Sequence, residues 1–275
     1  MAKPKITESL IKHAWYTYLT TGEMPAELNS PWFERKFFRP ILKRLPKNPR
    51  CNICYIPFEG IGGNFSRMFL HVEPSRLNPH ICNLCEQFAT QYYGGVELEI
   101  SMLFVDIRGS TTIAENTSPE EFGKLIRRFY KTVTEIFYRN NGFVEKLIGD
   151  EVAGFFVPGF AGEEHASVAI ETGRQIMKAL GYGSSSRPLV PAGMGIKTGV
   201  AYVGSVHAQG GAVDISILGD SVNTTARLTA QAAVGEILIG DRARQAANLD
   251  CTGLESMTLK LKGKSQDVTA WVLKI

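Results

Sequence analysis

Long apolar runs are absent from this sequence. No window approaches the ~18 consecutive apolar residues that a transmembrane helix needs. The opening residues, MAKPKITESLIKHAW, lack the apolar centre of a signal peptide. An excess of one charge is absent too, because 30 Lys+Arg face 27 Asp+Glu, and neither internal repeats nor low-complexity tracts occur. These absences argue against membrane, repeat and disordered proteins, and they predict a globular cytoplasmic protein.

Cysteine is scarce, but its spacing is informative. Four of the five cysteines form two CxxC pairs, and 27 residues separate the inner cysteines. In a reducing cytoplasm this pattern predicts a metal site rather than disulfides. Two CxxC knuckles are typical of structural Zn²⁺, with rubredoxin-like iron or an Fe–S cluster as alternatives. We interpret His80 as a loop residue, because four thiolates complete a tetrahedron. The four proposed ligands are Cys51, Cys54, Cys82 and Cys85.

The N-terminal third is more basic than the rest, with 12 Lys+Arg and 7 Asp+Glu in residues 1–95. Residues 7–20 have the apolar period of a helix, and Thr7 is a suitable N-cap. Residues 32–50 combine basic and aromatic residues, which could dock on a membrane or partner. We favour a packed helix with a solvated basic face, because Pro40 and Pro46 interrupt a long amphipathic helix. A nucleic-acid-binding zinc ribbon is an alternative that we rank below a structural or signalling role.

A change of pattern at Gly94-Gly95 predicts a domain boundary. We divide the chain into a helical and basic segment (1–50), a metal knuckle (51–95) and a larger domain (96–275). The order β-α-β-β-α-β in the larger domain predicts an α+β, ferredoxin-like fold with an antiparallel sheet and helices on one face. Its expected elements are a strand at 97–107, a helix at 118–141, a hairpin at 142–157, a helix at 163–180, strands at 193–206 and 213–218, and a helix from 219 to 232.

Charged residues interrupt the apolar hairpin at KLIGDE, residues 146–151. Buried charges are costly unless they are paired or bind a metal. Asp106 ends the strand 97–107, and Asp150 lies at the hairpin turn. Because these strands are central neighbours in a split βαβ sheet, we expect the two carboxylates to face each other and to hold hard cations. The turn at Gly109, Ser110 and Thr111 offers backbone N–H groups to a phosphate.

Four strings carry a resemblance to a known family. In order, they are FVDIRGST (104–111), KLIGDE (146–151), GIKTGVAYVG (195–204) and ILGDSVNTTARL (217–228). Together they resemble the class III adenylate/guanylate cyclase catalytic domain over residues 97–275. The GGDEF diguanylate cyclases share the paired carboxylates, but GDEV at 149–152 lacks the second Gly and the Phe of their signature.

The resemblance implies catalytic roles for five residues. Asp106 and Asp150, with the backbone carbonyl of Ile107, would hold two Mg²⁺ or Mn²⁺ ions that promote attack of the ribose 3′-hydroxyl on the α-phosphate. Asn223 would orient the ribose, and Arg227 would neutralise charge at the α-phosphate. Their separation of four residues places both on one face of a helix.

The resemblance also implies how the base and terminal phosphates are recognised. Lys146 matches the base-selecting position and suits the N1 acceptor of adenine, whereas guanine presents a donor there. Ser216 occupies the partner position, where many adenylate cyclases have Asp and a subset has Thr. Its hydroxyl can accept from the adenine amino group, but this departure weakens the prediction of ATP over GTP. Lys262 matches the lysine that binds the terminal phosphates, and Lys264 is the nearby alternative.

The resemblance implies a homodimer with two shared active sites. In the family, the metal-binding aspartates and the base-selecting lysine of one site come from different protomers, and this chain carries both sets. We therefore predict an adenylate cyclase that converts ATP to 3′,5′-cyclic AMP and pyrophosphate for intracellular signalling, without nucleic acid as a partner. The alternatives are a guanylate or dual-specificity cyclase and a non-catalytic cyclase-like binding domain.

Overall fold

The structure is a computed structural model that describes residues 7–22, 49–51, 54, 56–75, 81–185, 187–207, 213–260 and 267–275. The chain divides into two compact units. Unit 1 comprises Met1–Leu98 and Tyr202–Ile217, and unit 2 comprises Glu99–Ala201 and Leu218–Ile275. Most of the basic segment 32–50, His80, Lys262 and Lys264 lie outside the described residues, so the interpretations of these positions stay predictions.

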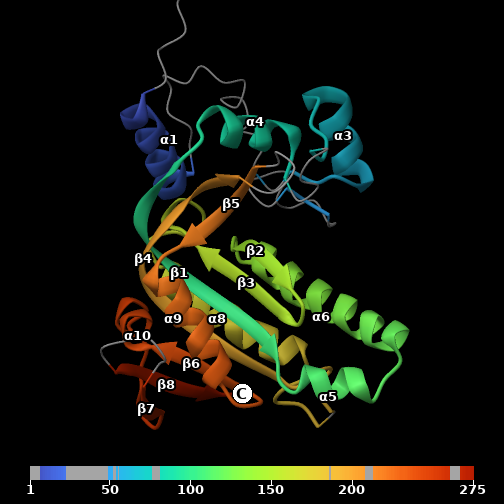
Figure 1. Ribbon diagram of the computed structural model, residues 1–275, viewed down its shortest axis with the longest axis vertical. Coiled ribbons are helices and arrows are strands. Elements are labelled where there is room, and N and C mark those ends of the chain that lie inside the picture. The colour runs from blue at the N-terminus through green and yellow to red at the C-terminus, as the bar shows by residue number, and fades with distance from the viewer. Residues whose placement is uncertain are drawn as a thin grey trace, which may run out of the picture. The chain divides into compact units, whose positions relative to one another are not determined.

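Unit 2 contains the predicted βαββαβ block. Its strands are hydrogen-bonded in the order β2-β3-β1-β4-β6-β8-β7 (Figure 1). The β2-β3-β1 part is antiparallel as expected, whereas β4 and β6 are parallel, so the sheet is mixed. The elements are β1 (Gly95–Ile107), α5 (Ser110–Glu115), α6 (Pro119–Arg139), β2 (Phe143–Ile148), β3 (Glu151–Phe156), α7 (Pro158–Ala161), α8 (His165–Ala179), β4 (Ala192–His207), α9 (Asp220–Gln231), β6 (Glu236–Gly240), α10 (Asp241–Ala246), β7 (Glu255–Leu259) and β8 (Val268–Lys274).

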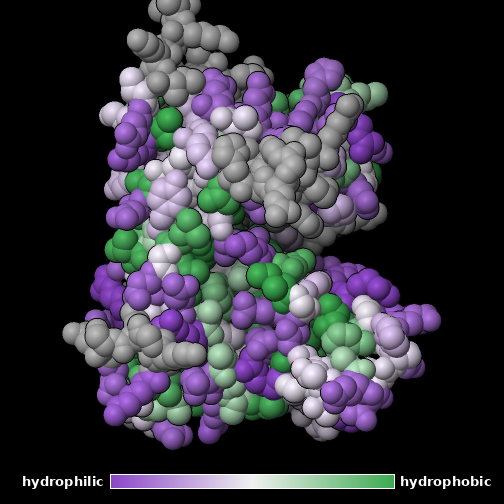
Figure 2. All heavy atoms as spheres, in the orientation of Figure 1, coloured by the Kyte–Doolittle hydropathy of each residue, from purple (hydrophilic) through white to green (hydrophobic). Residues whose placement is uncertain are grey.

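Helix α6 begins as its sequence predicts. The Ser118 hydroxyl accepts a hydrogen bond from the Glu121 backbone N–H at 3.2 Å, and the Glu121 carboxylate accepts from the Ser118 backbone in return. Pro119 fills the first helical position, where no backbone donor is needed. The helix buries an apolar stripe that includes Phe129 and Phe137, while polar side chains cover its visible outer edge (Figure 2).

Helices cover both faces of the unit 2 sheet, rather than the single face that was expected. Alternate residues of β6 show this, because Ile237 and Ile239 belong to the core cluster that contains α6 and α8. Leu238 points the other way and packs with Leu228 of α9 in a second cluster. The βαββαβ block itself supplies the helices of one face, and α9, which follows it in the chain, covers the opposite face.

A buried polar group crosses the centre of the same sheet. The Ser101 hydroxyl on β1 lies 2.6 Å from the Thr198 hydroxyl on β4 and 2.9 Å from His165 Nδ1 at the start of α8. Burial lowers the pKa of His165, while the nearby Glu99 opposes that shift. The hydrogen bonds satisfy polar atoms that would otherwise be costly to bury.

Unit 1 is built from short elements: α1 (Glu8–Thr21), α3 (Gly60–Leu70), α4 (Asn83–Gln91) and β5 (Val213–Leu218), which pairs with β4. The predicted first helix is confirmed, and Thr7 caps it by accepting from the Leu10 N–H at 3.2 Å. Trp15 is fully buried against Phe88 of α4, and its indole N–H donates to the Tyr92 carbonyl at 2.8 Å. These contacts join α1 to α4 within unit 1.

Helix α3 is absent from the sequence prediction, which treated the region between the cysteine pairs as short of regular structure. Its sequence, GIGGNFSRMFL, contains three glycines, which oppose helix formation. Gly63 explains part of this composition, because a Cβ there would collide with the backbone of Phe58. The helix also leaves large apolar side chains exposed, namely Ile61, Phe65, Met68 and Phe69. Across the described parts of the chain, none of the helices combines the length and apolar character that a membrane crossing requires.

Candidate functional site

The two predicted metal-binding aspartates come from adjacent strand ends of unit 2. Asp106, near the end of β1, pairs in register with Glu151 of β3, the residue after Asp150. The Ile107 N–H also donates to the Asp150 carbonyl at 3.2 Å. Gly149 completes the hairpin turn with φ of 61°, a conformation that favours glycine. The fold therefore places Asp106, Ile107 and Asp150 at neighbouring strand ends, while their binding of a metal ion stays a prediction.

Arg108 lies directly beside these carboxylates, a feature that the sequence reasoning missed. Its guanidinium forms an ion pair with Asp106, and its Nη1 donates to the Ala230 carbonyl at 3.1 Å. Burial lowers the pKa of Arg108, while the charges of Asp150 and Glu151 oppose that shift. Arg108 thus places positive charge among three acidic residues. The sequence signal that could have identified Arg108 was its position two residues after Asp106, directly beyond the end of β1.

Glu151 is an acidic neighbour of Asp106 and Asp150 to which the sequence analysis gave no role. Burial raises the pKa of Glu151, and the charge of Asp150 raises it further. Tyr130 of α6 supports the same turn, since its hydroxyl donates to the Gly149 carbonyl at 2.7 Å. Burial also raises the pKa of Tyr130. Crowded carboxylates at one sheet end create a negative potential that a cation relieves.

Lys146 is exposed on β2, on the same hairpin as Asp150. A β-bulge lies between Val144 and Lys146, so that the register with β3 shifts by one residue at Glu145. The Lys146 ammonium lies 3.3 Å from the Glu145 carboxylate, and 46% of the lysine side chain remains accessible. The charge that seemed buried in the sequence pattern is therefore available to a ligand.

Asn223 and Arg227 lie one turn apart on α9, as their spacing predicted. Asn223 is exposed and Arg227 is half-buried. Helix α9 can approach β4 closely because two of the three glycines in the GIKTGVAYVG string lie against it. A Cβ at Gly195 would collide with Thr229, and one at Gly199 would collide with Ser221. Two glycines in this motif therefore position α9 against the sheet.

The remaining predicted substrate contacts are distributed over both units. Gly109 precedes the short helix α5 with φ of 68°, and Ser110 and Thr111 begin that helix. Ser216 is 2% exposed on β5, in unit 1. The roles of these four residues in substrate binding stay predictions.

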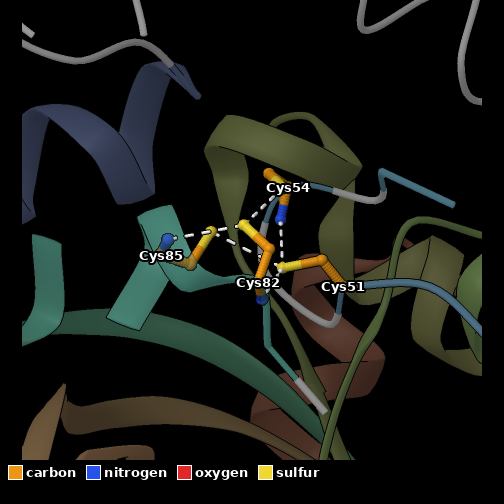
Figure 3. Close-up of side chains that lie close together, drawn as sticks. All are labelled: Cys51, Cys54, Cys82 and Cys85. Atoms are coloured by element: carbon orange, nitrogen blue, oxygen red, sulfur yellow. Dashed lines mark hydrogen bonds between the residues drawn. The ribbon is translucent and has the colours of Figure 1, made fainter. Parts of the chain in front are cut away.

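The four cysteines of the two CxxC pairs converge in unit 1, and their side chains point toward one another (Figure 3). Their sulfur atoms all lie within 4.8 Å of one another, and all four residues are buried. Burial raises the pKa of the Cys51 and Cys85 thiols. Such a cluster of soft donors is a candidate metal centre.

Solved cyclase structures resemble this fold. A guanylyl cyclase, Cya2, superposes with a TM-score of 0.59 and 26% identity over 65% of this chain and 93% of its own. The adenylyl cyclase CyaB from P. aeruginosa superposes with a TM-score of 0.56 and 25% identity over 66% of this chain and 96% of its own. The neighbours thus include both adenylyl and guanylyl cyclases.

A curated relative leads to the same family. An adenylate cyclase of Anabaena cylindrica is 26% identical over 187 residues, which are 64% of this chain. This chain covers 36% of that relative's length. Residues 95–274 match the family model described as the adenylate and guanylate cyclase catalytic domain, and the cysteine cluster lies outside that match. The chain therefore belongs to the adenylate and guanylate cyclase catalytic-domain family.

Proposed function

We propose that this chain is an adenylate cyclase that converts ATP to 3′,5′-cyclic AMP and pyrophosphate. The observation that carries the proposal is the adjacency of Asp106 and Asp150 at neighbouring strand ends, inside a domain of the cyclase family. In the reaction, the ribose 3′-oxygen forms a bond to the α-phosphorus. The bond from that phosphorus to the α,β-bridging oxygen breaks, pyrophosphate leaves, and the 3′-hydroxyl proton passes to solvent.

The acidic strand ends suit Mg²⁺ or Mn²⁺, with two ions for each site. Asp106, Asp150 and the Ile107 carbonyl provide oxygen donors, which hard divalent cations prefer. The Arg108 guanidinium is paired with Asp106 in this structure, so a metal ion at that carboxylate would displace it. When bound, the ions would lower the pKa of the 3′-hydroxyl and neutralise the triphosphate.

Side chains of α9 would act on the reacting atoms. Asn223 is exposed and can orient the ribose through its amide. Arg227, one turn away on the same face, can donate to the α-phosphate as negative charge increases there. Gly109, Ser110 and Thr111 would contribute to phosphate binding through the turn after β1.

Lys146 supports ATP as the substrate. Its exposed ammonium can donate to adenine N1 but not to the N1–H of guanine. Ser216 would accept from the adenine amino group. Guanylate cyclase activity is the second candidate, because Ser216 departs from the common Asp and because the Cya2 guanylyl cyclase is among the structural neighbours.

A symmetric homodimer would complete each active site. Lys146 and Asp150 belong to one hairpin but, in this proposal, serve different sites. Each protomer gives Lys146, Asn223 and Arg227 to one site and its aspartates to the other. Leu147 and Ile148, next to Lys146 on β2, are 38% and 57% exposed. Such apolar exposure beside a binding residue suits a protein interface.

Cyclic nucleotide formation by the purified chain tests this proposal. We would supply Mn²⁺ with ATP or GTP over a protein dilution series and compare Asp150→Asn, which removes the charge while keeping the shape. We expect cyclic AMP formation that falls at least about a hundredfold in the variant, as when an essential electrostatic group is lost. Glu120→Gln, an equal charge change on the exposed side of α6, is the control and should keep full activity.

Mixed dimers test the shared site. Asp150→Asn and Arg227→Ala protomers should each be inactive, yet mixing them should restore about a quarter of wild-type activity, because half of the dimers would contain one intact site. Failure to restore activity would count against the shared-site dimer. Cyclic GMP as the main product would favour the second candidate, and no product from either nucleotide would contradict the enzyme proposal.

A further inference from the structure

We propose that Cys51, Cys54, Cys82 and Cys85 bind one Zn²⁺ ion, and that this ion fixes the β4–β5 strand pair through α4. The site lies outside the residues that match the cyclase family, so family membership does not account for it. Among the described residues, these four cysteines form a group whose ligand atoms are close enough together to hold one metal ion. The zinc binding is independent of the proposed cyclase function, whereas the effect on Ser216 rests on it.

The spacing of the sulfur atoms suits a single tetrahedral ion. Cys51 Sγ lies 3.5 Å from Cys85 Sγ, and Cys54 Sγ lies 3.6 Å from Cys82 Sγ. With zinc–sulfur bonds of about 2.3 Å, the sulfur atoms of a tetrahedral site are about 3.8 Å apart. The cluster therefore needs little movement to accept an ion, and four ligands leave no open coordination position.

Backbone donors are already directed at the sulfur atoms. The Cys54 N–H donates to Cys51 Sγ at 3.5 Å, and the Cys85 N–H donates to Cys82 Sγ at 3.4 Å, so both CxxC pairs share one local geometry. A third donor, the Cys82 N–H, lies 3.2 Å from Cys51 Sγ. These donors stabilise thiolates, which are the form that binds metal.

Disulfides and two-iron clusters fit this geometry less well. A disulfide needs sulfur atoms about 2.0 Å apart, and none of the five cysteines, all of them described, forms one. The close contacts join Cys51 to Cys85 and Cys54 to Cys82, which brings the two CxxC pairs together around one point. Two iron atoms would divide four thiolates between two centres, whereas here all four lie within 4.8 Å.

From the cysteines, α4 extends to a close backbone contact with β4. Cys82 caps α4, whose buried Phe88 contacts Trp15, and the Trp15 indole donates to the Tyr92 carbonyl beyond the helix. Gly94 follows Tyr92 by two residues, and its carbonyl accepts a hydrogen bond from the Ser205 N–H of β4 at 2.7 Å. All these residues belong to unit 1. The series of contacts from the cysteines to β4 is therefore short and uninterrupted.

Two further contacts make the junction tight. The Gly94 N–H donates to the Ser205 hydroxyl at 2.8 Å. A Cβ at Gly95 or at Gly204 would collide with the opposite backbone, so these strands approach as only glycine allows. Beyond the junction, β4 pairs with β5, which carries Ser216. If Ser216 contacts the base, an unfixed β4–β5 pair should weaken substrate binding more than turnover.

Variants at Cys54 give the sharpest test, because this residue, 7% exposed, is the least buried of the four. Cys54→Ser removes a thiolate, whereas Cys54→His leaves a Cys₃His set that also binds zinc. Cys251→Ser is the control, since Cys251 lies in unit 2, outside the cluster. Full-length proteins would be produced with zinc and iron both supplied, and metal content would be measured by mass spectrometry.

We expect about one zinc per chain in wild type, Cys54→His and Cys251→Ser, and loss of most of it in Cys54→Ser. Hydrogen exchange at residues 94–95 and 203–206 should be at least about tenfold faster in Cys54→Ser alone. If the enzyme is active, KM for ATP should rise more than kcat falls. Iron, a disulfide or no metal in wild type would overturn the zinc site, and unchanged exchange after zinc loss would overturn the coupling.

The test remains decisive if Cys54→Ser does not fold. Wild-type protein reconstituted with Co²⁺ should show the intense visible absorption of tetrahedral cobalt–thiolate coordination, and its absence would contradict the site. Zinc content, cobalt absorption and hydrogen exchange are all measured without turnover. An inactive protein with one zinc would therefore contradict the cyclase proposal alone, and an active protein without metal at the cysteines would contradict this inference alone.

Discussion

Unit 2 buries large apolar side chains between a sheet and helices on both faces, whereas unit 1 combines short helices with a buried cluster of four cysteines. The difference is clearest in the helices. Helix α6 buries one continuous stripe, but α3 buries only Gly62, Gly63 and Ser66 and exposes several large apolar residues. Unit 2 thus has the more extensive apolar core, and we expect unit 1 to depend more strongly on its proposed metal ion.

Metal removal should have the largest effect, and it should destabilise unit 1 while leaving unit 2 folded. An organomercurial reagent would displace the metal by reacting with the thiolates, and Cys251→Ser would remove the thiol outside the cluster. We expect α1 and α4 to lose their protection from hydrogen exchange, while α6 and α8 keep theirs. The reason is that zinc binding to small domains contributes on the order of 10 kcal/mol to their folding. Exchange measured peptide by peptide would check this, and parallel loss of protection in unit 2 would contradict the comparison.

Phe137→Ala should be the next largest change and should act on unit 2. Phe137 is fully buried, stacks on Phe156 with ring centroids 5.5 Å apart, and packs against Gly154. We expect the free energy of unfolding of unit 2 to fall by about 3–5 kcal/mol. Urea unfolding would measure the loss, while the zinc content should stay unchanged.

Ile61→Ala is the matched control for this core substitution. Ile61 lies on α3 and is 88% exposed, so its truncation should change stability by less than about 0.5 kcal/mol. A large effect of Ile61→Ala would mean that apolar contacts of α3 matter more than its exposure indicates, and the contrast between the units would weaken.

Two helix caps compare the units at a smaller scale. Ser118→Ala in unit 2 and Thr7→Ala in unit 1 each remove a side-chain oxygen that accepts a backbone N–H. Each should cost about 1 kcal/mol. We expect the first loss in global unfolding and the second only in local exchange of α1, because α1 belongs to the smaller unit. Ser118→Asp and Thr7→Asp keep a cap and should retain most of the stability.

His165→Gln tests the smallest effect, which is a change in how stability depends on pH. Burial lowers the pKa of His165 in the folded state, with Arg242 acting in the same direction and Glu99, Glu163 and Glu164 against it. The unfolded chain therefore binds the proton first, and unit 2 should lose stability as the pH falls below about 6.5.

In the glutamine variant this contribution should disappear while other acid-sensitive groups remain. Urea unfolding of both proteins at about pH 7.5 and about pH 5.5 would compare them on either side of the histidine's ordinary pKa. An identical pH dependence in wild type and variant would show that His165 does not titrate across this range.

Local signals predicted the elements that depend on local interactions. The Ser-Pro-Glu-Glu sequence at 118–121 predicted the start of α6, and Thr7 predicted that of α1, because capping involves residues within one helical turn. The alternation of strands and helices likewise predicted the βαββαβ order. The adjacency of Asp106 and Asp150 followed from that order, since it places β3 beside β1.

Features that depend on close tertiary approach could not be predicted in the same way. Helix α3 contains glycines that oppose a helix until Phe58 packs against one of them. Arg108 gained significance only when the hairpin brought Asp150 and Glu151 beside it. Helix α9 could not be assigned to its face of the sheet until β6, which is parallel to β4, joined it. In each case the deciding neighbour is distant in sequence.

The β-bulge at Glu145 decides which side of strand β2 the Lys146 side chain faces. Val144 belongs to the core, and in a regular strand Lys146, two residues later, would point to the same side. The extra residue reverses the alternation, so the ammonium faces outward. Loss of the bulge with Glu145 retained would turn the lysine toward the core, because Lys146 would then oppose Val152 instead of Ala153. Deletion of Glu145 would keep Lys146 opposite Ala153 and leave the ammonium outside, so the bulge, and not the chemistry of Glu145, sets the side that the lysine faces.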